Sequence, residues 1–482
     1  MIGELRPYPA MRDAGVPWLG EVPDHWEVRR LKRLCARSAL YGANVVASAY
    51  AATGVRFLRT TDITEEGHLK GKGVFIPIEL VRDYLLADGD VLVSRSGTIG
   101  RSFLYDSKTH GPCAYAGYLV RFVPTSDVLP KYVFLFTKTP AFATFLRVMA
   151  ISSTIENVNG EKYANAALPL PPLPEQAGIV RFLDHADRRI RRYIRAKQKL
   201  IKLLEEQKQA IIHRAVTRGL DPNVRLKPSG VEWLGEVPEH WDFTRLKFVA
   251  PHIVDCLHAT PVYSDAGDHP AIRTADVRPG ELLLHSARRV DEEHYRQWTA
   301  RMAPTAGDIL YTREGERFGI SALVPPGVRL CISQRMMVFR IQENQNAAYI
   351  MWQINCQHVR AQAAADLIGA AAPHVNVARI RNFEITLPPR AEQDAIIAVV
   401  QEAMGHPNAA IQIAREEISL LREYRTRLIA DVVTGKLDVR EAAARLPEEV
   451  AETEPLDETD VLIDTEDAPA DDVDAAPEEA RA

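Results

Sequence analysis

Several features that are common in secreted, membrane and metal-binding proteins are missing from this sequence of 482 residues. Its five cysteines are odd in number and show no C-x-x-C spacing, which argues against a disulfide framework and against a zinc site. No run of about 18 apolar residues occurs, and no basic segment leads into an apolar stretch at the N-terminus, so neither a membrane span nor export is indicated. We therefore expect reduced thiols and a cytoplasmic protein.

Catalytic signatures are missing as well. No G-x-x-x-x-G-K-[ST] phosphate loop occurs, so ATP-driven translocation is not encoded. None of the P-P pairs is followed by an aromatic residue, as the N/D/S-P-P-Y/F/W motif of adenine methyltransferases requires. The nearest approach to a metal-nuclease motif, residues 206–208 (EQK), falls in a helical segment, and His25, His213 and His240 have no ligand-spaced partner. The sequence predicts no catalytic residue, no metal site and no cofactor on this chain.

Charge is distributed unevenly along the chain. Residues 441–482 hold 16 Asp and Glu against Arg445 and Arg481, whereas residues 1–440 hold 57 Lys and Arg against 48 Asp and Glu. A segment so acidic, with almost no aromatic residues, cannot bury enough apolar surface to fold, so we predict a disordered tail over residues 439–482. Solubility is the favoured role for this tail. Competition with nucleic acid for the basic body is the alternative.

What is present is a duplication. Gly15 to Lys32 recurs as Gly230 to Lys247 with 13 of 18 positions identical, and Leu170 to Gln176 recurs as Leu387 to Gln393. A repeat of this length indicates duplication of a whole domain with its connector, because solenoid units have only about 20 to 50 residues. Two copies on one chain favour a pseudo-two-fold arrangement.

The interiors of the two copies, residues 33–168 and 248–386, alternate short β-type runs with apolar helical segments. Shared anchors such as GDVLVSRSG at 89–97 and GDILYTREG at 307–315 indicate that one mixed fold occurs twice, without revealing its topology. We predict an α+β protein with helical spacers and a tail. The predicted segments are 1–168 and 223–386 for the globular domains, 169–222 and 387–438 for the spacers, and 439–482 for the tail.

Each spacer carries apolar residues at alternating three- and four-residue steps, which is the pattern of a coiled-coil seam. Because proline is tolerated only in the first turn of a helix, Gly405 to Pro407 predict a break between helices at about 391–404 and 408–434, with a matching junction near 184–187. The first long helix, 188–218, would then act as a ruler. The seam residues are Ile194, Lys197, Ile201, Leu204, Lys208, Ile211 and Ala215 in the first copy, and Ile411, Ala414, Ile418, Leu421, Arg425, Leu428 and Val432 in the second.

Arginines on turns beside the β-runs are candidates for binding DNA, because guanidinium groups grip guanine or phosphate in a bidentate manner. Arg59 and Arg273 occupy equivalent positions, as do Arg95 and Arg313. The alternative is a structural role in ion pairs with Asp62 and Asp276, or with Asp90 and Asp308; it is favoured for the first pair and stays open for the second. Arg101, Lys108, Gln334 and Arg335 are further candidates for binding DNA. Residues that differ between the copies are the better candidates for reading bases, such as Tyr115 and Ala116 against Ser333 and Gln334, or Lys108 and His110 against Pro326 and Arg329.

The repeated W-L-G-E-V-P-x-H-W motif contains Trp18 and Trp26 in the first copy and Trp233 and Trp241 in the second. These rings are suited to stacking on bases. Identical elements at the head of two diverged domains, however, favour docking of each domain on the spacer.

In combination, these motifs resemble the specificity subunit of type I restriction-modification enzymes. They are G-V-x-W-L-G-E-V-P-x-H-W at 15–26 and 230–241, R-T-x-D at 59–62 and 273–276, G-D-[VI]-L at 89–92 and 307–310, L-P-P-x-x-E-Q at 170–176 and 387–393, and the endings at 215–221 and 432–438. They follow the order of the family and span residues 15–438. A stand-alone DNA-binding regulator and a scaffold without nucleic acid are the remaining alternatives.

The resemblance implies two target recognition domains that each read half of a split sequence in double-stranded DNA, held apart by antiparallel helices. It implies two methyltransferase subunits that bind S-adenosylmethionine, flip an adenine out of the duplex and methylate it. Restriction and translocase subunits, which use ATP and Mg, would join them. Because the two interiors differ, we expect the two half-sites to differ and the target not to be a palindrome.

Overall fold

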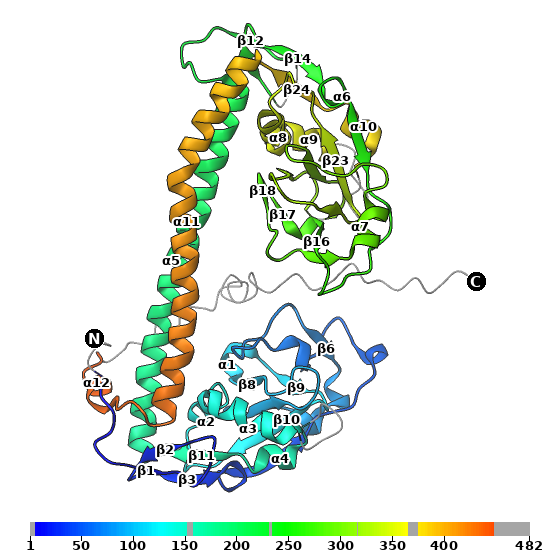
Figure 1. Ribbon diagram of the computed structural model, residues 1–482. Helices are drawn as coiled ribbons and strands as arrows, with labels where there is room; N and C mark the ends of the chain where they lie inside the picture. Colours follow the sequence, from blue (N-terminus) through cyan, green and yellow to red (C-terminus); the bar gives the residue numbers. More distant parts are fainter. Residues whose placement is uncertain (1–4, 152–157, 231–233, 316, 365–374, 448–482) are drawn as a thin grey trace. The chain divides into compact units, whose positions relative to one another are not determined.

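The computed structural model describes residues 5–151, 158–230, 234–315, 317–364 and 375–447, which fall into two compact units (Figure 1). Unit 1 contains the described residues up to Gln198 and those from Arg415 onward. Unit 2 contains the described residues from Lys199 to Ala414. Two helices, α5 (Leu173–Arg218) and α11 (Arg390–Val433), begin in one unit and end in the other.

The globular part of unit 1 is built on two small sheets, of order β4-β10-β7-β8 and β6-β5-β9, in which only β5 and β9 run parallel. Two further pairs, β1-β2 and β11-β3, connect it to α5. The strands are β1 (Met11–Asp13), β2 (Glu21–Pro23), β3 (Glu27–Arg30), β4 (Cys35–Tyr41), β5 (Val55–Leu58), β6 (Val74–Ile76), β7 (Val91–Ser94), β8 (Ser102–Leu104), β9 (Cys113–Tyr115), β10 (Leu119–Pro124) and β11 (Ala167–Leu170), and the short helices are α1 (Ser107–His110), α2 (Pro130–Phe136), α3 (Pro140–Ile151) and α4 (Gly160–Ala164).

Unit 2 repeats this plan with sheets of order β15-β23-β20-β21 and β19-β16-β22, in which β16 and β22 run parallel, and with the pairs β12-β13 and β14-β24. A short extra pair, β17-β18, is added. The strands are β12 (Leu226–Pro228), β13 (Glu236–Pro238), β14 (Asp242–Arg245), β15 (His252–Asp255), β16 (His269–Ile272), β17 (Val277–Arg278), β18 (Glu281–Leu282), β19 (Arg288–Val290), β20 (Ile309–Thr312), β21 (Ser321–Leu323), β22 (Cys331–Ile332), β23 (Met336–Arg340) and β24 (Glu384–Leu387), and the helices are α6 (Leu246–Val249), α7 (Glu292–Trp298), α8 (Ala347–Asn355), α9 (Gln357–Ala364) and α10 (Val377–Arg381).

Strand order and the one parallel pair agree between the units. The prediction that one mixed fold occurs twice is therefore confirmed, and the α+β class with it. The topology itself could not be predicted, because it depends on which distant strands pair.

Helices α5 and α11 lie side by side and run antiparallel. In unit 1, Asp187 of α5 pairs with Arg425 of α11, and Lys197 pairs with Glu417, with 2.6 Å between Lys197 Nζ and Glu417 Oε2. Numbers rise along one helix as they fall along the other, which only an antiparallel pair allows. Every residue of the predicted seam is buried or half-buried, including Ile194, Ile411, Ile418 and Leu428, whereas most residues between seam positions are exposed.

The predicted break near Pro407 is wrong. Helix α11 continues through Pro407, and α5 continues through residues 184–187, so that α5 has 46 residues and is about 69 Å long at about 1.5 Å per residue. Pro407 is buried and lies on the apolar stripe between Met404 and Ile411. Burial of the apolar stripe on either side of it, at Met404 and Ile411, keeps the helix continuous despite the cost of about 3 kcal/mol for a proline inside a helix.

Replacing Pro407 by alanine is accordingly expected to stabilise the protein. Alanine restores the missing N–H donor and removes the clash with the carbonyl of the preceding turn, while some apolar contact and some restriction of the unfolded chain are lost. We expect a net gain of about 1 to 2 kcal/mol in the free energy of unfolding, measured by urea denaturation. A loss of stability would show that the ring itself is required at this point of the seam.

The repeated tryptophan motif docks each globular domain on the first turn of its own long helix. In unit 1, Glu175 at the start of α5 accepts a bond from Trp26 Nε1 at 3.1 Å and from Tyr8 at 2.6 Å, and its other oxygen lies 2.9 Å from His25 Nε2. Trp26 is fully buried. The next residue, Gln176, is also buried and accepts a bond from the backbone N–H of Leu129 at 2.8 Å.

Unit 2 repeats these contacts. Glu392 at the start of α11 accepts from Trp241 Nε1 at 3.0 Å and lies 2.8 Å from His240 Nε2, and buried Gln393 accepts from the N–H of Asn346 at 2.9 Å. The docking interpretation is confirmed for Trp26 and Trp241. Trp233 lies outside the described residues.

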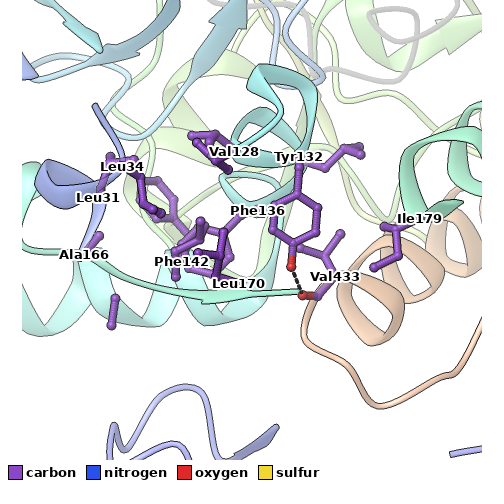
Figure 2. Packing of buried hydrophobic residues seen from close by; sticks show 14 of the residues in the cluster. Leu31, Leu34, Val128, Tyr132, Phe136, Phe142, Ala166, Leu170, Ile179 and Val433 are labelled. Atoms are coloured by element: carbon purple, nitrogen blue, oxygen red, sulfur yellow. Dashed lines mark hydrogen bonds between the residues drawn. The ribbon is translucent and has the colours of Figure 1, made fainter. Parts of the chain in front are cut away.

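A buried tyrosine from each globular domain binds the last turn of a long helix. Figure 2 shows Tyr132 within the core of unit 1, where its hydroxyl donates to the carbonyl of Val433 at 3.0 Å. In unit 2, the hydroxyl of Tyr349 lies 3.3 Å from the carbonyl of Val216 near the end of α5. Each tyrosine thus satisfies a carbonyl that has no partner within its own helix.

The chain stays folded beyond the predicted start of the tail at residue 439. Val439, Ala443 and Leu446 are buried in the core of unit 1, and α12 (Arg440–Ala444) packs on α5, where Arg181 donates to the carbonyl of Ala443. The predicted tail boundary is therefore too early. Sequence analysis did not predict this folded segment, because so few apolar residues form no recognisable periodic pattern.

Burial of His358 makes the stability of unit 2 depend on pH. Its side chain is 1% exposed, its Nε2 lies 3.0 Å from Gln353 Oε1, and desolvation, together with nearby His213, lowers its pKa to about 4. Below about pH 6.5, His358 therefore binds a proton in the unfolded chain but not in the folded chain. The contribution of this group to the free energy of unfolding is fully present above that pH and is lost as the pH falls toward 4.

We expect the free energy of unfolding to fall by about 1 kcal/mol through this group between pH 7.5 and 5.5. The measurement is calorimetric unfolding of the protein and of its His358→Gln variant at both pH values. The variant should show a smaller loss by that amount, and identical losses would contradict the assignment.

Candidate nucleic-acid interface

One end of the large sheet of unit 1 brings together two loops that are distant in the sequence. We call residues 95–101, between β7 and β8, together with residues 116–118 before β10, the first loop junction. The N–H of Arg95 donates to the carbonyl of Tyr118 at 3.0 Å, which joins the loops. Gly97 has a φ of +70° and nothing within 4 Å of where a Cβ would lie, so it serves an open turn rather than a close contact.

Unit 2 contains the same arrangement. Residues 313–315 and 317–319, between β20 and β21, and residues 333–335 before β23 form the second loop junction. The N–H of Arg313 donates to the carbonyl of Arg335 at 2.9 Å, and Gly315 has a φ of +84° in open space. Arg335 has a φ of +67°, a conformation that is costly for a side chain of this size and that is often found at functional sites.

Strand register establishes which residues of the two junctions correspond. Leu119 pairs with Ser94 and Met336 with Thr312, so Tyr118 and Arg335 occupy the same position. The comparison of Tyr115 with Ser333 was therefore wrong by one residue. The counterpart of Ser333 is Ala116, since their N–H groups bond the equivalent carbonyls of Leu58 and Ile272. Gln334 then matches Gly117, and Tyr115 is buried.

The equivalent arginines Arg95 and Arg313 have different neighbours. Tyr41 and Asp255 stand at the same place in the register, opposite Val120 and Met337. The guanidinium of Arg95 lies 4.9 Å from the centre of the Tyr41 ring, and Tyr41 and Tyr118 are 43% and 63% exposed. The first junction thus presents aromatic and cationic surface, which suits stacking on bases and contact with phosphate.

Arg313, in contrast, is 6% exposed. It forms an ion pair with Asp255, and its Nε donates to the carbonyl of Val375 at 2.9 Å. The structure therefore places this predicted DNA ligand inside the domain, where it fixes the loop that carries Arg335. The sequence could not distinguish it from Arg95, because the difference arises from Asp255, 58 residues away.

Arg59 and Arg273 make the ion pairs that the structural alternative predicts. Arg59 donates to Asp62 at 2.7 Å and Arg273 donates to Asp276 at 3.1 Å, and each carboxylate also accepts from the backbone N–H of its arginine. The aspartates are buried, so these pairs hold the turns after β5 and β16. Asp90 and Asp308, in contrast, pair with Arg121 and Arg340 rather than with Arg95 and Arg313.

Arg101 lies at the end of the first junction and donates to the carbonyl of Ile63 at 3.1 Å. Arg317, which sequence analysis missed, donates to the equivalent carbonyl of Val277 at 3.2 Å and is exposed. The two arginines differ in their offset from the glycines of the loop, so only the shared contact reveals them as counterparts. Lys108 is exposed on α1.

The exposed face of the long helices carries apolar residues that the seam does not use. Leu203 on α5 and Leu420 on α11, which are equivalent in the repeat, are 52% and 63% exposed. The predicted seam residues Ile201, Leu204, Ile211 and Leu421 instead contribute to the helix pair. A surface for partner proteins is therefore better sought at the outward leucines.

Among the described residues no group of three or more His, Cys, Asp or Glu side chains could hold a metal ion. The five cysteines are free thiols. No helix in the described ranges is long and apolar enough to cross a membrane.

Comparison with known proteins places these features in context. The protein-family model of the type I restriction modification DNA specificity domain matches residues 23–203 of this chain. The chain is 26% identical to the putative type I restriction enzyme MjaX specificity subunit of Methanocaldococcus jannaschii, over 88% of this chain and 96% of the relative. It is 20% identical to the EcoKI specificity subunit of Escherichia coli, over 76% and 78%.

A solved structure of a type I restriction-modification system contains a chain with the same fold. The TM-score is 0.58 at 16% identity, with 86% of this chain and 99% of that chain covered. At this identity the likeness concerns the fold.

Proposed function

This chain is a specificity subunit of a type I restriction-modification system, and from that premise we propose that each globular domain reads one half of a bipartite DNA target. The observation that carries the proposal is the loop junction, which occurs at the same place in both units with different residues. When two domains of the same fold recognise different DNA sequences, they should keep the same backbone contacts and differ in the side chains that they expose. Tyr118 and Arg335 meet this expectation.

The two junctions offer different chemistry for recognition. Tyr118, Tyr41 and Arg95 provide stacking surface and positive charge, whereas Arg335 and Arg317 provide guanidinium groups that bind guanine edges or phosphates. Lys108 and Arg101 are suited to phosphate contacts, which position the protein on DNA without reading sequence. Different side chains at equivalent positions predict different half-sites.

We further propose that the long helices bind two methyltransferase subunits through their outward apolar residues. The chemistry then belongs to the partners: the methyltransferase would hold S-adenosylmethionine, and restriction or translocase subunits would use ATP and Mg. This chain contributes binding and orientation, because it presents no residue pattern suited to transferring a methyl group.

Single substitutions at the junctions test whether each globular domain recognises one half-site. In the assembled methyltransferase complex, Tyr118→Ala should weaken recognition of one half-site and Arg335→Gln that of the other, each by about 1 to 3 kcal/mol, because a stacking or bidentate contact is lost. Affinity is measured against targets in which each half-site is replaced in turn. Arg335→Gln keeps a side chain of similar length at the same φ, so backbone strain is unchanged.

Arg296→Gln, a change at an exposed arginine on α7, is the matched control for loss of charge. It should weaken binding to all sequences alike, if at all. If both junction variants weakened binding equally for every DNA sequence, the junctions would contact phosphate only and the proposed reading would be wrong.

A further inference from the structure

A third loop of unit 1, residues 42–54 between β4 and β5, reaches the first loop junction. The N–H of Gly117 donates to the carbonyl of Ala43 at 2.9 Å, and the N–H of Ala43 donates to the carbonyl of Tyr115 at 2.9 Å. The next residue of this loop, Asn44, is exposed. Its side chain therefore lies on the surface beside the first loop junction.

The amide of Asn44 takes the place of a side chain on Gly117. A Cβ added to Gly117 would collide with Asn44 Oδ1 and would lie 3.1 Å from Asn44 Cγ. Gly117 does not have a positive φ, so its backbone conformation would suit other residues. The space that Asn44 occupies is what leaves room only for glycine at this position.

Unit 2 has an amide at the equivalent position, but this amide comes from the other loop. Gln334 is the counterpart of Gly117 in the strand register, and its side chain is half-buried at the second loop junction. By the same register the counterpart of Asn44 is His258, whose Nε2 lies 3.2 Å from Asp255 Oδ2. Each junction thus carries one carboxamide beside its exposed reading residues.

The two carboxamides are available to a ligand. Within the part of the chain that the structure describes, the side chains of Asn44 and Gln334 make no hydrogen bond. A carboxamide offers an acceptor and a donor side by side, whichever way it is turned. The edge of adenine in the major groove presents the matching pair, with N7 as acceptor and the N6 amino group as donor, and Asn or Gln binds both atoms at once.

We propose that Asn44 and Gln334 each read one adenine, Asn44 in the half-site bound by unit 1 and Gln334 in the half-site bound by unit 2. This assignment rests on the proposed function and names one base that each junction recognises. Sequence comparison could not reveal the equivalence, because each amide aligns with a residue of another kind. Tyr118 and Arg335 remain the residues by which the two half-sites differ.

Replacing each adenine of the mapped target in turn by 7-deazaadenine tests the contact, because this base lacks only the N7 acceptor. The assembled methyltransferase complex should lose about 2- to 10-fold in affinity at one adenine in each half-site, as expected for one hydrogen bond. Asn44→Ala should abolish this effect in one half-site, and Gln334→Ala should abolish it in the other. Gln297→Ala, which removes an exposed amide on α7, is the matched control and should keep both effects.

Gly117→Ala provides a second variant, which keeps both amides in the sequence. The added methyl group displaces the side chain of Asn44 while the backbone conformation suits alanine. Sensitivity to 7-deazaadenine should therefore fall in the half-site of unit 1 and stay unchanged in the half-site of unit 2. Unchanged sensitivity in both half-sites would contradict the placement of the Asn44 amide at the base.

Equal sensitivity to 7-deazaadenine in the parent, Asn44→Ala and Gln334→Ala complexes would overturn the adenine assignment. Failure of half-site reading gives a different result, because Tyr118→Ala and Arg335→Gln would then show no preference between the half-sites. If those two variants act on separate half-sites while the amide variants change nothing, half-site reading stands and only the adenine assignment is wrong.

Discussion

Gly435→Ala is expected to destabilise unit 1 by about 3 kcal/mol. Gly435 follows the end of α11 with a φ of +79°, and a Cβ there would lie 2.7 Å from Pro23 Cγ and 3.0 Å from the Trp26 ring. A left-handed alanine costs about 1 to 2 kcal/mol, and the enforced shift of packed neighbours adds about 1 to 3 kcal/mol. The glycine is thus what lets the tryptophan motif reach the end of the helix.

Gly405→Ala is the matched control. Gly405 lies inside α11 with nothing within 4 Å of an added Cβ and no positive φ, so alanine there should stabilise the helix by up to about 1 kcal/mol. Urea denaturation of both variants measures the difference. A Gly435→Ala protein as stable as the parent would show that Pro23 and Trp26 can withdraw without loss, against the docking described above.

Lengthening both long helices should change the DNA target without changing its half-sites. Seven residues inserted between Gln198 and Lys199, and seven between Ala414 and Arg415, keep the seam on one face because the apolar pattern repeats every 3.5 residues on average. The added length is about 10 Å, or about three base pairs. We expect methylation of the original target to fall at least about 100-fold, because one half-site is no longer reached.

Methylation mapping of DNA from cells that carry the assembled complex gives the readout. The recovered target should keep both half-sequences with a longer spacer between them. The same seven residues inserted after Glu449 should leave the target unchanged. Original spacing retained in the double-insertion variant would refute the role of α5 and α11 as a ruler.

Much of the fold followed from patterns that lie close together in the sequence. The seam over residues 194–215 and its copy over 411–432 depend only on local spacing, and every position is at least half-buried. Trp26 and Trp241 were assigned to docking because an identical sequence motif in two diverged domains favours a shared structural contact. Trp26 is buried against Glu175, and Trp241 is buried against Glu392.

The candidate interface was less accessible to this reasoning. Arg95 and Arg313 lie in nearly identical sequence motifs. Arg95 nevertheless lies over the Tyr41 ring, whereas Arg313 is buried against Asp255. The register that makes Tyr118 the counterpart of Arg335 depends on strand pairing, so counting along the sequence gave a comparison that was wrong by one residue. Arg317 was missed for the same reason.

The sequence by itself determined that this protein is built twice and that its helices pair through a seam, since repeats and heptads are properties of neighbouring residues. Tertiary structure alone decided that α11 continues through Pro407, that Val439, Ala443 and Leu446 belong to the core, and which arginines are available at the surface. These outcomes depend on contacts between segments far apart in the chain. There, the free energy of burial outweighs local propensity, and the identity of one distant partner determines whether a charge is buried or exposed.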